Sequence, residues 1–182
     1  QIKLRKYYKT IHFKEFLIIR ETPSIQHQQT RKYFMRLIER AQKSITIITP
    51  YFLPGKILRK KMIRASKRGV HIQVIIPQHS DVKIADYMRN VYLGQLHNNE
   101  VDIRYYQNAN IHAKLLLVDD KVFSIGSSNL DYRSFRYMYE INLSGENKHI
   151  SSLLKEYVED TLQNCKKFDY LKWTMRPLWE RI

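Results

Sequence analysis

The sequence predicts an α/β fold in which helices flank a mixed β-sheet, and three observations carry this prediction. The chain has 182 residues, which suits one domain with a real hydrophobic core. Hydrophobic residues make up 43% of it, as in folded globular chains. Helix-like and strand-like apolar patterns alternate early in the chain, and two later strands are close enough to form a hairpin.

The first half is expected to hold a lead-in segment followed by alternating helices and strands. The basic residues 1–24, which include a strand-like FLIIRE, are interpreted as a linker or lead-in to a compact module at residues 25–182. SITIITP and HIQVIIP read as buried strands, the first ended by Pro50. Gly69 is the expected end of the second helix. Helical spacing places Phe34, Leu37, Ile38 and Ala41 in one helix and Leu58, Met62 and Ala65 in the next.

The second half is expected to begin with a long helix and to continue with strands. SDVKIADYMRNVYLGQL reads as the helix, with Ser80 or Asp81 as its N-cap. VDIRYY, AKLLLV, VFSIG and YEINL read as strands, and a short turn at residues 119–121 joins AKLLLV to VFSIG. A closing helix is predicted by Leu153, Leu154, Tyr157, Val158 and Leu162.

Charge and composition narrow the classes of partner. A formal net charge of +15 implies an anionic partner, either nucleic acid or a negatively charged membrane surface. Cys165 is the only cysteine, which excludes an intrachain disulfide and a thiolate metal cluster. No apolar run approaches the roughly 18 residues of a membrane span, and no signal peptide is visible. The chain begins with Gln1, which indicates a fragment or a processed product.

The stretch IHAKLLLVDDKVFSIGSSNLDYRSF, residues 111–135, holds an unusual set of polar residues. Side chains two apart on a strand share a face, so His112 and Lys114 are expected to project together. The returning strand would bring Ser127 and Asn129 near the start of the hairpin. Asp119 is seven residues from His112, so it would face the other way and support the hairpin.

These residue types suit a phosphate ester. Lys114 would supply a point charge for phosphate oxygens, Asn129 an amide donor, and Ser127 with nearby backbone N–H groups further donors. The imidazole of His112 could attack phosphorus or move a proton at neutral pH, with Glu140 as the best candidate to orient it. The competing interpretation is a surface strand whose polar residues share no task. The similar pair His12 and Lys14 is interpreted as chance, because no Gly-Ser-x-Asn follows it.

The pattern His-x-Lys, four residues, Asp, six residues, Gly-Ser-x-Asn resembles the signature of the phospholipase D superfamily, the HKD motif. GSSNLDYRSF, ITPYFLP and SKRGVHIQVIIP are similar to segments of bacterial cardiolipin synthases, as is the W-x-x-RPLW-x-R pattern from Trp173 to Arg181. The resemblance covers roughly residues 30–182 and corresponds to the second of that family's two catalytic modules.

The resemblance implies a mechanism and a role for each motif residue. Two HKD motifs would face each other, one His forming a phosphohistidine intermediate and the other protonating the leaving alcohol, with no metal or other cofactor. Carried over, His112 would be the nucleophile or the acid/base, and Asp119 would brace the motif. Phosphate would be bound by Lys114 and Asn129 with help from Ser127, and Glu140 would orient His112.

The implied reaction joins two phosphatidylglycerol molecules into cardiolipin and releases glycerol. This chain has one complete motif, so a second HKD module is expected in the same parent chain or in a homodimer partner, and the isolated chain is expected to be inactive. Anionic phospholipid and the membrane surface would be its partners. The expected location is the bacterial cell membrane, peripheral for this fragment, with a membrane-anchored parent protein.

Four points stay open at this stage. Met138 stands where the family usually has Asn two residues before Glu140, which weakens the assignment of substrate. One alternative is a homodimeric, single-motif nuclease of the same superfamily that acts on nucleic-acid phosphodiesters. Another is a non-catalytic module that binds lipid. The basic face of residues 56–69 is interpreted either as a solvated surface or as an attraction to anionic lipid headgroups.

Overall fold

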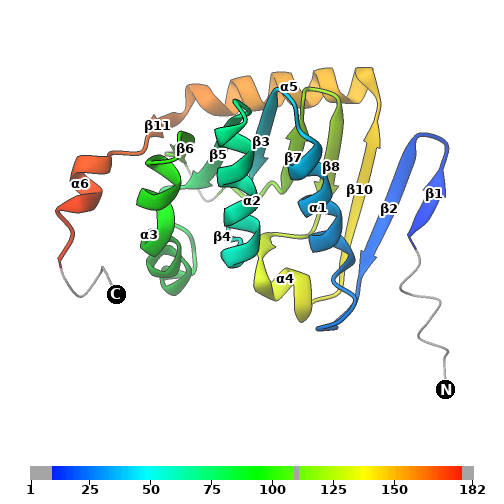
Figure 1. The fold of residues 1–182 in the computed structure, drawn as a ribbon, viewed down its shortest axis with the longest axis horizontal. Coiled ribbons are helices and arrows are strands. Elements are labelled where there is room, and N and C mark those ends of the chain that lie inside the picture. The colour runs from blue at the N-terminus through cyan, green and yellow to red at the C-terminus, as the bar shows by residue number, and fades with distance from the viewer. Residues whose placement is uncertain (1–9, 109–110, 178–182) are drawn as a thin grey trace.

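The computed structural model describes residues 10–108 and 111–177. Its strands form a nine-stranded sheet in the order β1-β2-β10-β8-β7-β3-β5-β6-β11 and a small sheet of β4 and β9 (Figure 1). The helices are α1 (Gln29–Arg40), α2 (Gly55–Lys67), α3 (Lys83–His97), α4 (Tyr132–Arg136), α5 (Lys148–Gln163) and α6 (Tyr170–Thr174). The strands are β1 (Ile11–Phe13), β2 (Phe16–Glu21), β3 (Ser44–Ile48), β4 (Phe52–Leu53), β5 (His71–Pro77), β6 (Val101–Tyr106), β7 (Leu115–Val118), β8 (Val122–Gly126), β9 (Leu130–Asp131), β10 (Glu140–Glu146) and β11 (Cys165–Lys167).

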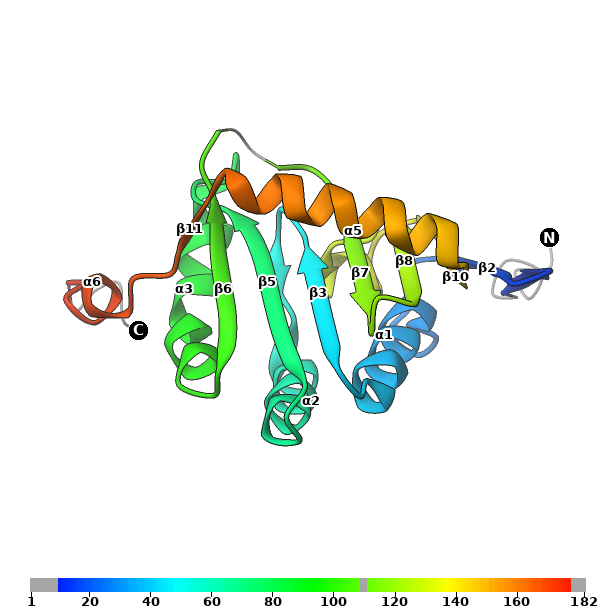
Figure 2. The same cartoon turned by 90° about the horizontal axis from the view of Figure 1, so that it is seen from above.

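The large sheet is mixed, as the sequence predicts. β3, β5 and β6 pair in parallel, while every other neighbouring pair in this sheet is antiparallel. Parallel neighbours need crossover connections, and α2 and α3 supply them. Seen from above, α1, α2 and α3 cover one face of the sheet and α5 covers the other (Figure 2). The prediction of an α/β fold with flanking helices is therefore confirmed.

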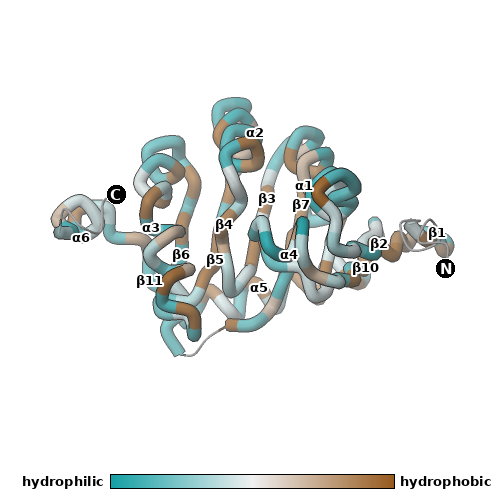
Figure 3. Tube along the Cα trace, turned by 90° about the horizontal axis from the view of Figure 1, so that it is seen from below, coloured by the Kyte–Doolittle hydropathy of each residue, from teal (hydrophilic) through white to brown (hydrophobic). Residues whose placement is uncertain are grey.

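The central strands are buried on both faces, so they read as continuous apolar runs. Ile45 and Ile47 of β3 point toward the helices α1–α3, whereas Ile48 belongs to the core beneath α5. The same division separates Val74 from Ile75 in β5. Apolar colour follows the central strands in Figure 3, while the outer ends of α1 and α2 are hydrophilic. The core thus fixes the sheet between two helical layers.

The first two helices follow the apolar spacing of the sequence. Phe34 and Ile38 of α1 are buried, as are Leu58, Met62 and Ala65 of α2. Gly69 lies one residue beyond the C-cap of α2 with φ of 88°, a left-handed conformation that glycine adopts without strain. These elements and the end of α2 are confirmed.

The N-cap expected for α3 is wrong. α3 begins at Lys83 with Val82 at the N-cap position, and neither Ser80 nor Asp81 caps it with a side chain. Ser80 instead accepts a hydrogen bond from the Val82 backbone N–H at 3.2 Å. Asp81 accepts one from the Tyr51 hydroxyl at 2.6 Å, so its carboxylate is used in a long-range contact.

Part of the expected lead-in segment, residues 1–24, lies within the sheet. Strand β2 pairs with β10 over six positions, from Glu140 opposite Glu21 to Gly145 opposite Phe16. The Glu21 side chain is buried and accepts a hydrogen bond from the Thr30 backbone N–H at 2.8 Å, at the start of α1. Strand β2 is therefore part of the module's sheet, although the sequence analysis assigned residues 16–21 to the lead-in segment.

The expected hairpin of β7 and β8 is present. Asp119 and Asp120 form its turn with φ of 55° and 53°, the left-handed values that a tight hairpin turn requires.

Within the residues that the structure describes, no helix combines the length and apolar character needed to cross a bilayer.

Candidate active site

The motif residues other than Asp119 meet at one edge of the large sheet. Strand β3 ends there, where Ile48 is opposite Leu115 at the start of β7. Leu115 is in turn opposite Ile125, near the end of β8, and Gly126 is opposite Asn142 in β10. The segments 111–114, 127–129 and the first residue of β10 therefore emerge side by side.

His112 and Lys114 lie just before β7, not on it as the sequence predicts. β7 begins at Leu115, so strand alternation does not position the two side chains. Lys114 instead bends back, with its Nζ atom donating to the His112 carbonyl at 2.7 Å and lying 3.1 Å from the His112 Nδ1 atom. An ammonium group only donates, so this contact favours the neutral imidazole with its proton on Nε2. The two side chains are thus brought together by a turn of the chain.

Several carboxylates surround the half-buried Lys114. Burial lowers the pKa of the Lys114 amine, because a charged group loses hydration there. The charges of Glu140, Asp131 and Asp81 oppose this and favour the ammonium form. Glu140 therefore acts on Lys114 through its charge. In the described part of the chain, no hydrogen bond joins Glu140 to His112.

Ser127 and Ser128 are fixed by the neighbouring strand β10. The Ser127 backbone N–H donates to the Ile141 carbonyl at 3.0 Å, and its hydroxyl accepts from the Ile141 N–H at 3.0 Å. The buried amide of Asn142 donates to the Ser128 hydroxyl at 2.7 Å and accepts from its backbone N–H at 3.3 Å. These paired contacts hold the Gly-Ser-Ser-Asn loop firmly on β10.

Gly126 permits this close approach. A Cβ atom at Gly126 would lie 2.2 Å from the Ile141 carbonyl oxygen and 2.6 Å from the Asn142 Oδ1 atom. Both distances are far below van der Waals contact, and one of the two atoms belongs to the backbone. The Gly of the motif is therefore required by packing at this bend.

The Asn129 backbone N–H donates to the Ser134 hydroxyl at 3.1 Å. Its side-chain Oδ1 atom is buried and has no hydrogen-bond partner within the described residues. No hydrogen bond joins Asn129 to His112 or Lys114 in that part of the chain. Asn129 therefore lies at the same sheet edge as His112 and Lys114, but its position is fixed by Ser134 and not by a contact with either of them.

Asp119 lies at the far end of β7 from His112. Its carboxylate accepts hydrogen bonds from the backbone N–H groups of Gln42, Lys43 and Ser44, the shortest at 2.7 Å. Burial opposes its charge, but these three donors outweigh burial and lower the Asp119 pKa. Asp119 thus ties the hairpin turn to the start of β3 and does not reach the other motif residues.

The sequence interpretation missed Tyr51, Asp81 and Asp131 at this edge. The pair β4 and β9 brings Leu53 opposite Asp131, which places the segment after β3 beside the motif loop. Burial and the hydrogen bond to Asp81 raise the pKa of Tyr51 to about 12. Asp131 is buried and caps α4 by accepting from the Ser134 N–H at 2.6 Å. Tyr51 lies in ITPYFLP and Asp131 in GSSNLDYRSF, the segments that resemble cardiolipin synthases. That resemblance is the sequence signal from which both residues could have been assigned to the site.

Met138 is exposed two residues before Glu140, and Tyr139 beside it is 77% exposed.

Within the described ranges, no group of three or more His, Cys, Asp or Glu side chains is placed to hold a metal ion. The donors that gather here are the His112 imidazole, the Lys114 ammonium and the Ser127 hydroxyl. Such a set suits an anionic oxygen ligand such as a phosphate.

Comparison with known proteins agrees with this chemistry. Residues 34–162 match the profile of the family described as "Cardiolipin synthase, PLD-like domain", where PLD stands for phospholipase D. The chain is 32% identical over 165 residues to the major cardiolipin synthase ClsA of Bacillus subtilis, covering 91% of this chain and 34% of the relative. It is also 32% identical over 178 residues to a cardiolipin synthase of Listeria welshimeri, covering 96% and 37%. The chain thus spans about a third of the length of these relatives.

Solved structures share the fold at low sequence identity. Nuc from Salmonella typhimurium, a phospholipase D family member, matches with a TM-score of 0.69 at 19% identity over 83% of this chain and 98% of its own. Phosphatidylserine synthase of Haemophilus influenzae matches with a TM-score of 0.71 at 16% identity over 91% of this chain and 44% of its own. Fold, motif and sequence agree, and the chain belongs to the cardiolipin synthase family of phospholipase D-like domains.

Proposed function

We propose that this chain is the C-terminal catalytic module of a phosphatidyltransferase that makes cardiolipin from two phosphatidylglycerol molecules. The observation that carries the proposal is the Lys114–His112 pair, a cation beside an imidazole at an open edge of the sheet. His112 is exposed and therefore accessible to a substrate. The two cardiolipin synthases at 32% identity support a phospholipid as the substrate.

In the proposed reaction, the substrate phosphate draws the Lys114 ammonium away from the His112 Nδ1 atom. Asn129 and Ser127 bind further phosphate oxygens. Once Lys114 has moved, the imidazole exchanges its Nε2 proton through water for one on Nδ1, where the Glu140 carboxylate accepts a hydrogen bond, and the freed Nε2 lone pair attacks phosphorus. The Nε2–P bond forms as the bond from phosphorus to the glycerol oxygen breaks.

The second half of the reaction reverses these steps. The hydroxyl of a second phosphatidylglycerol attacks the phosphohistidine, the Nε2–P bond breaks, and cardiolipin is released. A second histidine is needed to protonate the departing glycerol and then to deprotonate the acceptor hydroxyl. That residue belongs to a second HKD module, supplied by the parent chain or by another copy. Asp119 takes no part in the chemistry and braces the motif.

Exposed apolar residues beside Glu140 support a covering module. Tyr137, Met138, Tyr139 and Ile141 are all more than 40% exposed, next to the proposed site. An apolar rim of this kind suits contact with a second module, which would also exclude water from the phosphohistidine. Water exclusion matters because hydrolysis would divert the intermediate from transfer. In this proposal the complete protein works at the bacterial membrane surface, and this module is peripheral to it.

A nuclease is the second candidate. It is favoured by the net charge of +15 and by fold similarity to Nuc and to NucT from Helicobacter pylori, which the chain matches with a TM-score of 0.66 at 18% identity. In that case a homodimer would bring two copies of His112 together to cleave a nucleic-acid phosphodiester.

One pair of assays separates the two candidates. The parent protein and the 182-residue chain are each incubated with phosphatidylglycerol vesicles and with single-stranded DNA. Release of cardiolipin and glycerol by the parent protein, lost in His112→Ala, supports the transferase. DNA cleavage that disappears in His112→Ala, without lipid turnover, supports the nuclease and contradicts the transferase.

A further inference from the structure

A cavity apart from the motif residues lies between α3, the loop after β5 and the segment that joins β11 to α6. It encloses about 630 Å³ and none of the motif residues lines it. Six basic side chains line it, against the two carboxylates of Asp86 and Asp169. The basic residues are Lys83, Arg89, Lys166, Lys167, Lys172 and Arg176.

The two carboxylates are already engaged. Asp86 accepts from the Ser80 backbone N–H at 2.9 Å and pairs with Arg89 at 3.1 Å. Asp169 accepts from the Lys172 backbone N–H at 2.9 Å as the N-cap of α6. In the described part of the chain, no ion pair is found for the four lysines of the cavity, which are exposed. The cavity therefore holds an excess of positive charge with donors that point into solvent.

Arg89 places a buried charge at the base of this cavity. Its side chain is 3% exposed, and its Nη2 atom donates to the Gln78 carbonyl at 2.7 Å. Its Nε and Nη1 atoms are buried and make no hydrogen bond to the described residues. The guanidinium also lies over the Tyr105 ring, 5.7 Å from the centroid. A buried guanidinium with two unused donors is costly, and an anion in the cavity would offset that cost.

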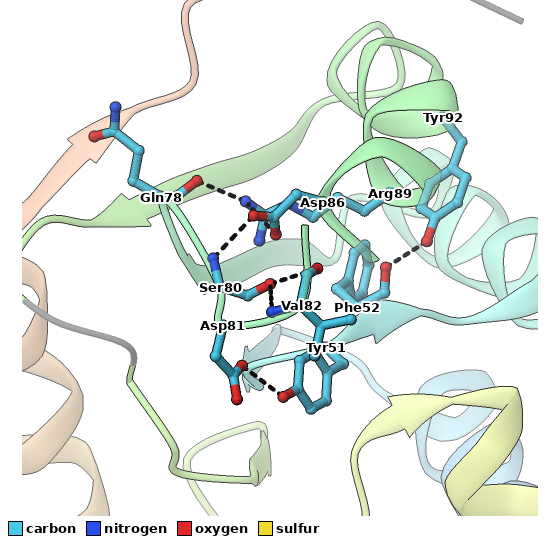
Figure 4. Close-up of polar contacts among 9 residues, drawn as sticks. All are labelled: Tyr51, Phe52, Gln78, Ser80, Asp81, Val82, Asp86, Arg89 and Tyr92. Carbon is cyan, nitrogen blue, oxygen red and sulfur yellow. Dashed lines mark hydrogen bonds and ion pairs between the residues drawn. The ribbon is translucent and has the colours of Figure 1, made fainter. Parts of the chain in front are cut away.

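The loop after β5 separates this cavity from the catalytic edge. Figure 4 shows Arg89 reaching toward Gln78 and Asp86, while Asp81 points to Tyr51 on the other side of the loop. Ser80 lines the cavity, and Asp81 influences the charge of Lys114. The basic cavity and the catalytic edge thus lie on either side of one short loop.

An apolar stripe borders the cavity. Ile84, Tyr87, Met88 and Val91 occupy successive turns of α3 and are between 43% and 68% exposed. Tyr87 also lines the cavity, so the stripe and the basic residues share an edge. Leu171 of α6 is 73% exposed on another helix that contributes to the cavity. A nucleic-acid backbone offers nothing to such residues, whereas a bilayer offers acyl chains beside its phosphates.

We propose that this cavity binds the headgroup phosphate of an anionic phospholipid while the α3 stripe inserts at the membrane surface. It is a second lipid site without catalytic residues, and it does not depend on the reaction proposed above. The exposed lysines contact the phosphate oxygens, and Arg89 supplies charge from beneath. The site would hold the protein on the membrane beside its catalytic edge.

The first test measures vesicle binding by flotation at low salt. All proteins are 182-residue chains carrying Lys114→Ala, so that phosphate binding at the catalytic edge does not contribute. The probe is mixed vesicles of phosphatidylglycerol and phosphatidylcholine, with pure phosphatidylcholine as reference. Each lysine near an anionic surface changes affinity about fivefold, so Lys166→Gln with Lys172→Gln is expected to lower affinity roughly 25-fold.

The matched control is Lys60→Gln with Lys67→Gln, which removes the same charge from exposed positions of α2. It is expected to change affinity less than about twofold, because α2 lies apart from the proposed contact. Equal losses in the two double variants would overturn the proposal, since binding would then follow net charge alone.

A second arm identifies the source of the phosphate. Ile84→Ser with Val91→Ser is expected to weaken vesicle binding at least fivefold while leaving the affinity for soluble glycerol phosphate unchanged. Unaltered vesicle binding in this variant would contradict insertion of the stripe. Binding of inorganic phosphate or single-stranded DNA that requires Lys166 and Lys172, without any vesicle binding, would contradict a lipid ligand.

Discussion

The Nζ atom of Lys114 lies 3.1 Å from the Nδ1 atom of His112, although strand geometry did not place them there. The contact comes from the chain just before β7, where Lys114 folds back on the His112 carbonyl. It gives the two residues a resting arrangement in which the cation blocks one ring nitrogen. In the proposed mechanism, substrate phosphate competes with the imidazole for that cation, so phosphate binding and activation of His112 would be coupled.

Lys114→Ala is expected to lower phosphatidyl transfer by the parent protein at least about a hundredfold, because one charge that stabilises the reacting phosphate is lost. Lys121→Ala is the control, since Lys121 is exposed beyond the hairpin turn. Turnover is measured as glycerol release. Equal turnover of the two variants would contradict a phosphate-binding role for Lys114.

Asp119→Ala is expected to lower the free energy of unfolding by about 2–3 kcal/mol at pH 7, because three backbone donors lose a charged acceptor. The folded state lowers the Asp119 pKa, so its stabilisation is full above the unfolded value of 3.8 and is lost as pH falls through the folded pKa. The difference between wild type and variant should therefore shrink in acid. Urea unfolding at pH 7 and at about pH 3 measures both.

The neighbouring Asp120→Ala is the matched control for Asp119. Asp120 pairs with Lys155 at 2.9 Å, and both side chains are about half exposed. An exposed pair contributes about 0–1 kcal/mol, so this variant should lose little. A loss as large as that of Asp119→Ala would contradict the bracing role.

Asn142→Ala is expected to cost about 2–3 kcal/mol and to loosen the motif loop. The buried Asn142 amide bonds to Ser128 and to the Thr30 hydroxyl, so its removal leaves several buried groups unpaired. Amide hydrogen exchange at residues 127–129 should accelerate along with the loss of stability. Asn98→Ala removes an exposed bond to Tyr170 and should change stability by less than about 0.5 kcal/mol.

Asp81→Asn is expected to lower the Tyr51 pKa from about 12 toward 10, because the carboxylate accepts a hydrogen bond from the phenol and repels the phenolate. The decrease in pKa should be partial, because burial is the largest cause of the raised Tyr51 pKa and the substitution leaves burial unchanged. NMR titration with ring-labelled tyrosine follows Tyr51 directly. Asp160→Asn, on the exposed face of α5, should leave the titration unchanged. No change in the Asp81 variant would contradict the coupling.

The longer elements could be predicted from sequence because burial imposes regular spacing. Helices α1 and α2 carry Phe34 and Met62 at helical intervals, and β3 and β5 are continuous apolar runs. The elements β1, β4, β9, β11, α4 and α6 were missed, since two to five residues give no measurable period.

The role of β2 depends on a distant partner. Its residues read as a strand, but only pairing with β10 makes it part of the sheet. The cap of α3 was wrong for a similar reason, because Asp81 bonds to Tyr51, thirty residues earlier in the chain. Contacts between residues this far apart in the chain cannot be predicted from the sequence around either residue.

The site was predicted only as a set of residues. Spacing brought His112, Lys114 and Ser127 to one sheet edge, as the hairpin of β7 and β8 requires. It did not foresee that Lys114 would contact the imidazole itself, or that Asp131 would join the charges around it. Those features depend on side-chain conformation and on the pairing of β4 with β9.

The central claim, that His112 attacks phosphorus and forms a phosphohistidine, is tested most directly by trapping the intermediate. The parent protein is mixed with phosphatidylglycerol labelled with ³²P in its phosphodiester and quenched in alkali, in which phosphohistidine survives. The account predicts label bound to protein, located on His112 by mass spectrometry and absent from His112→Ala. Label on protein that persists unchanged in His112→Ala, or full turnover by that variant, would contradict the account.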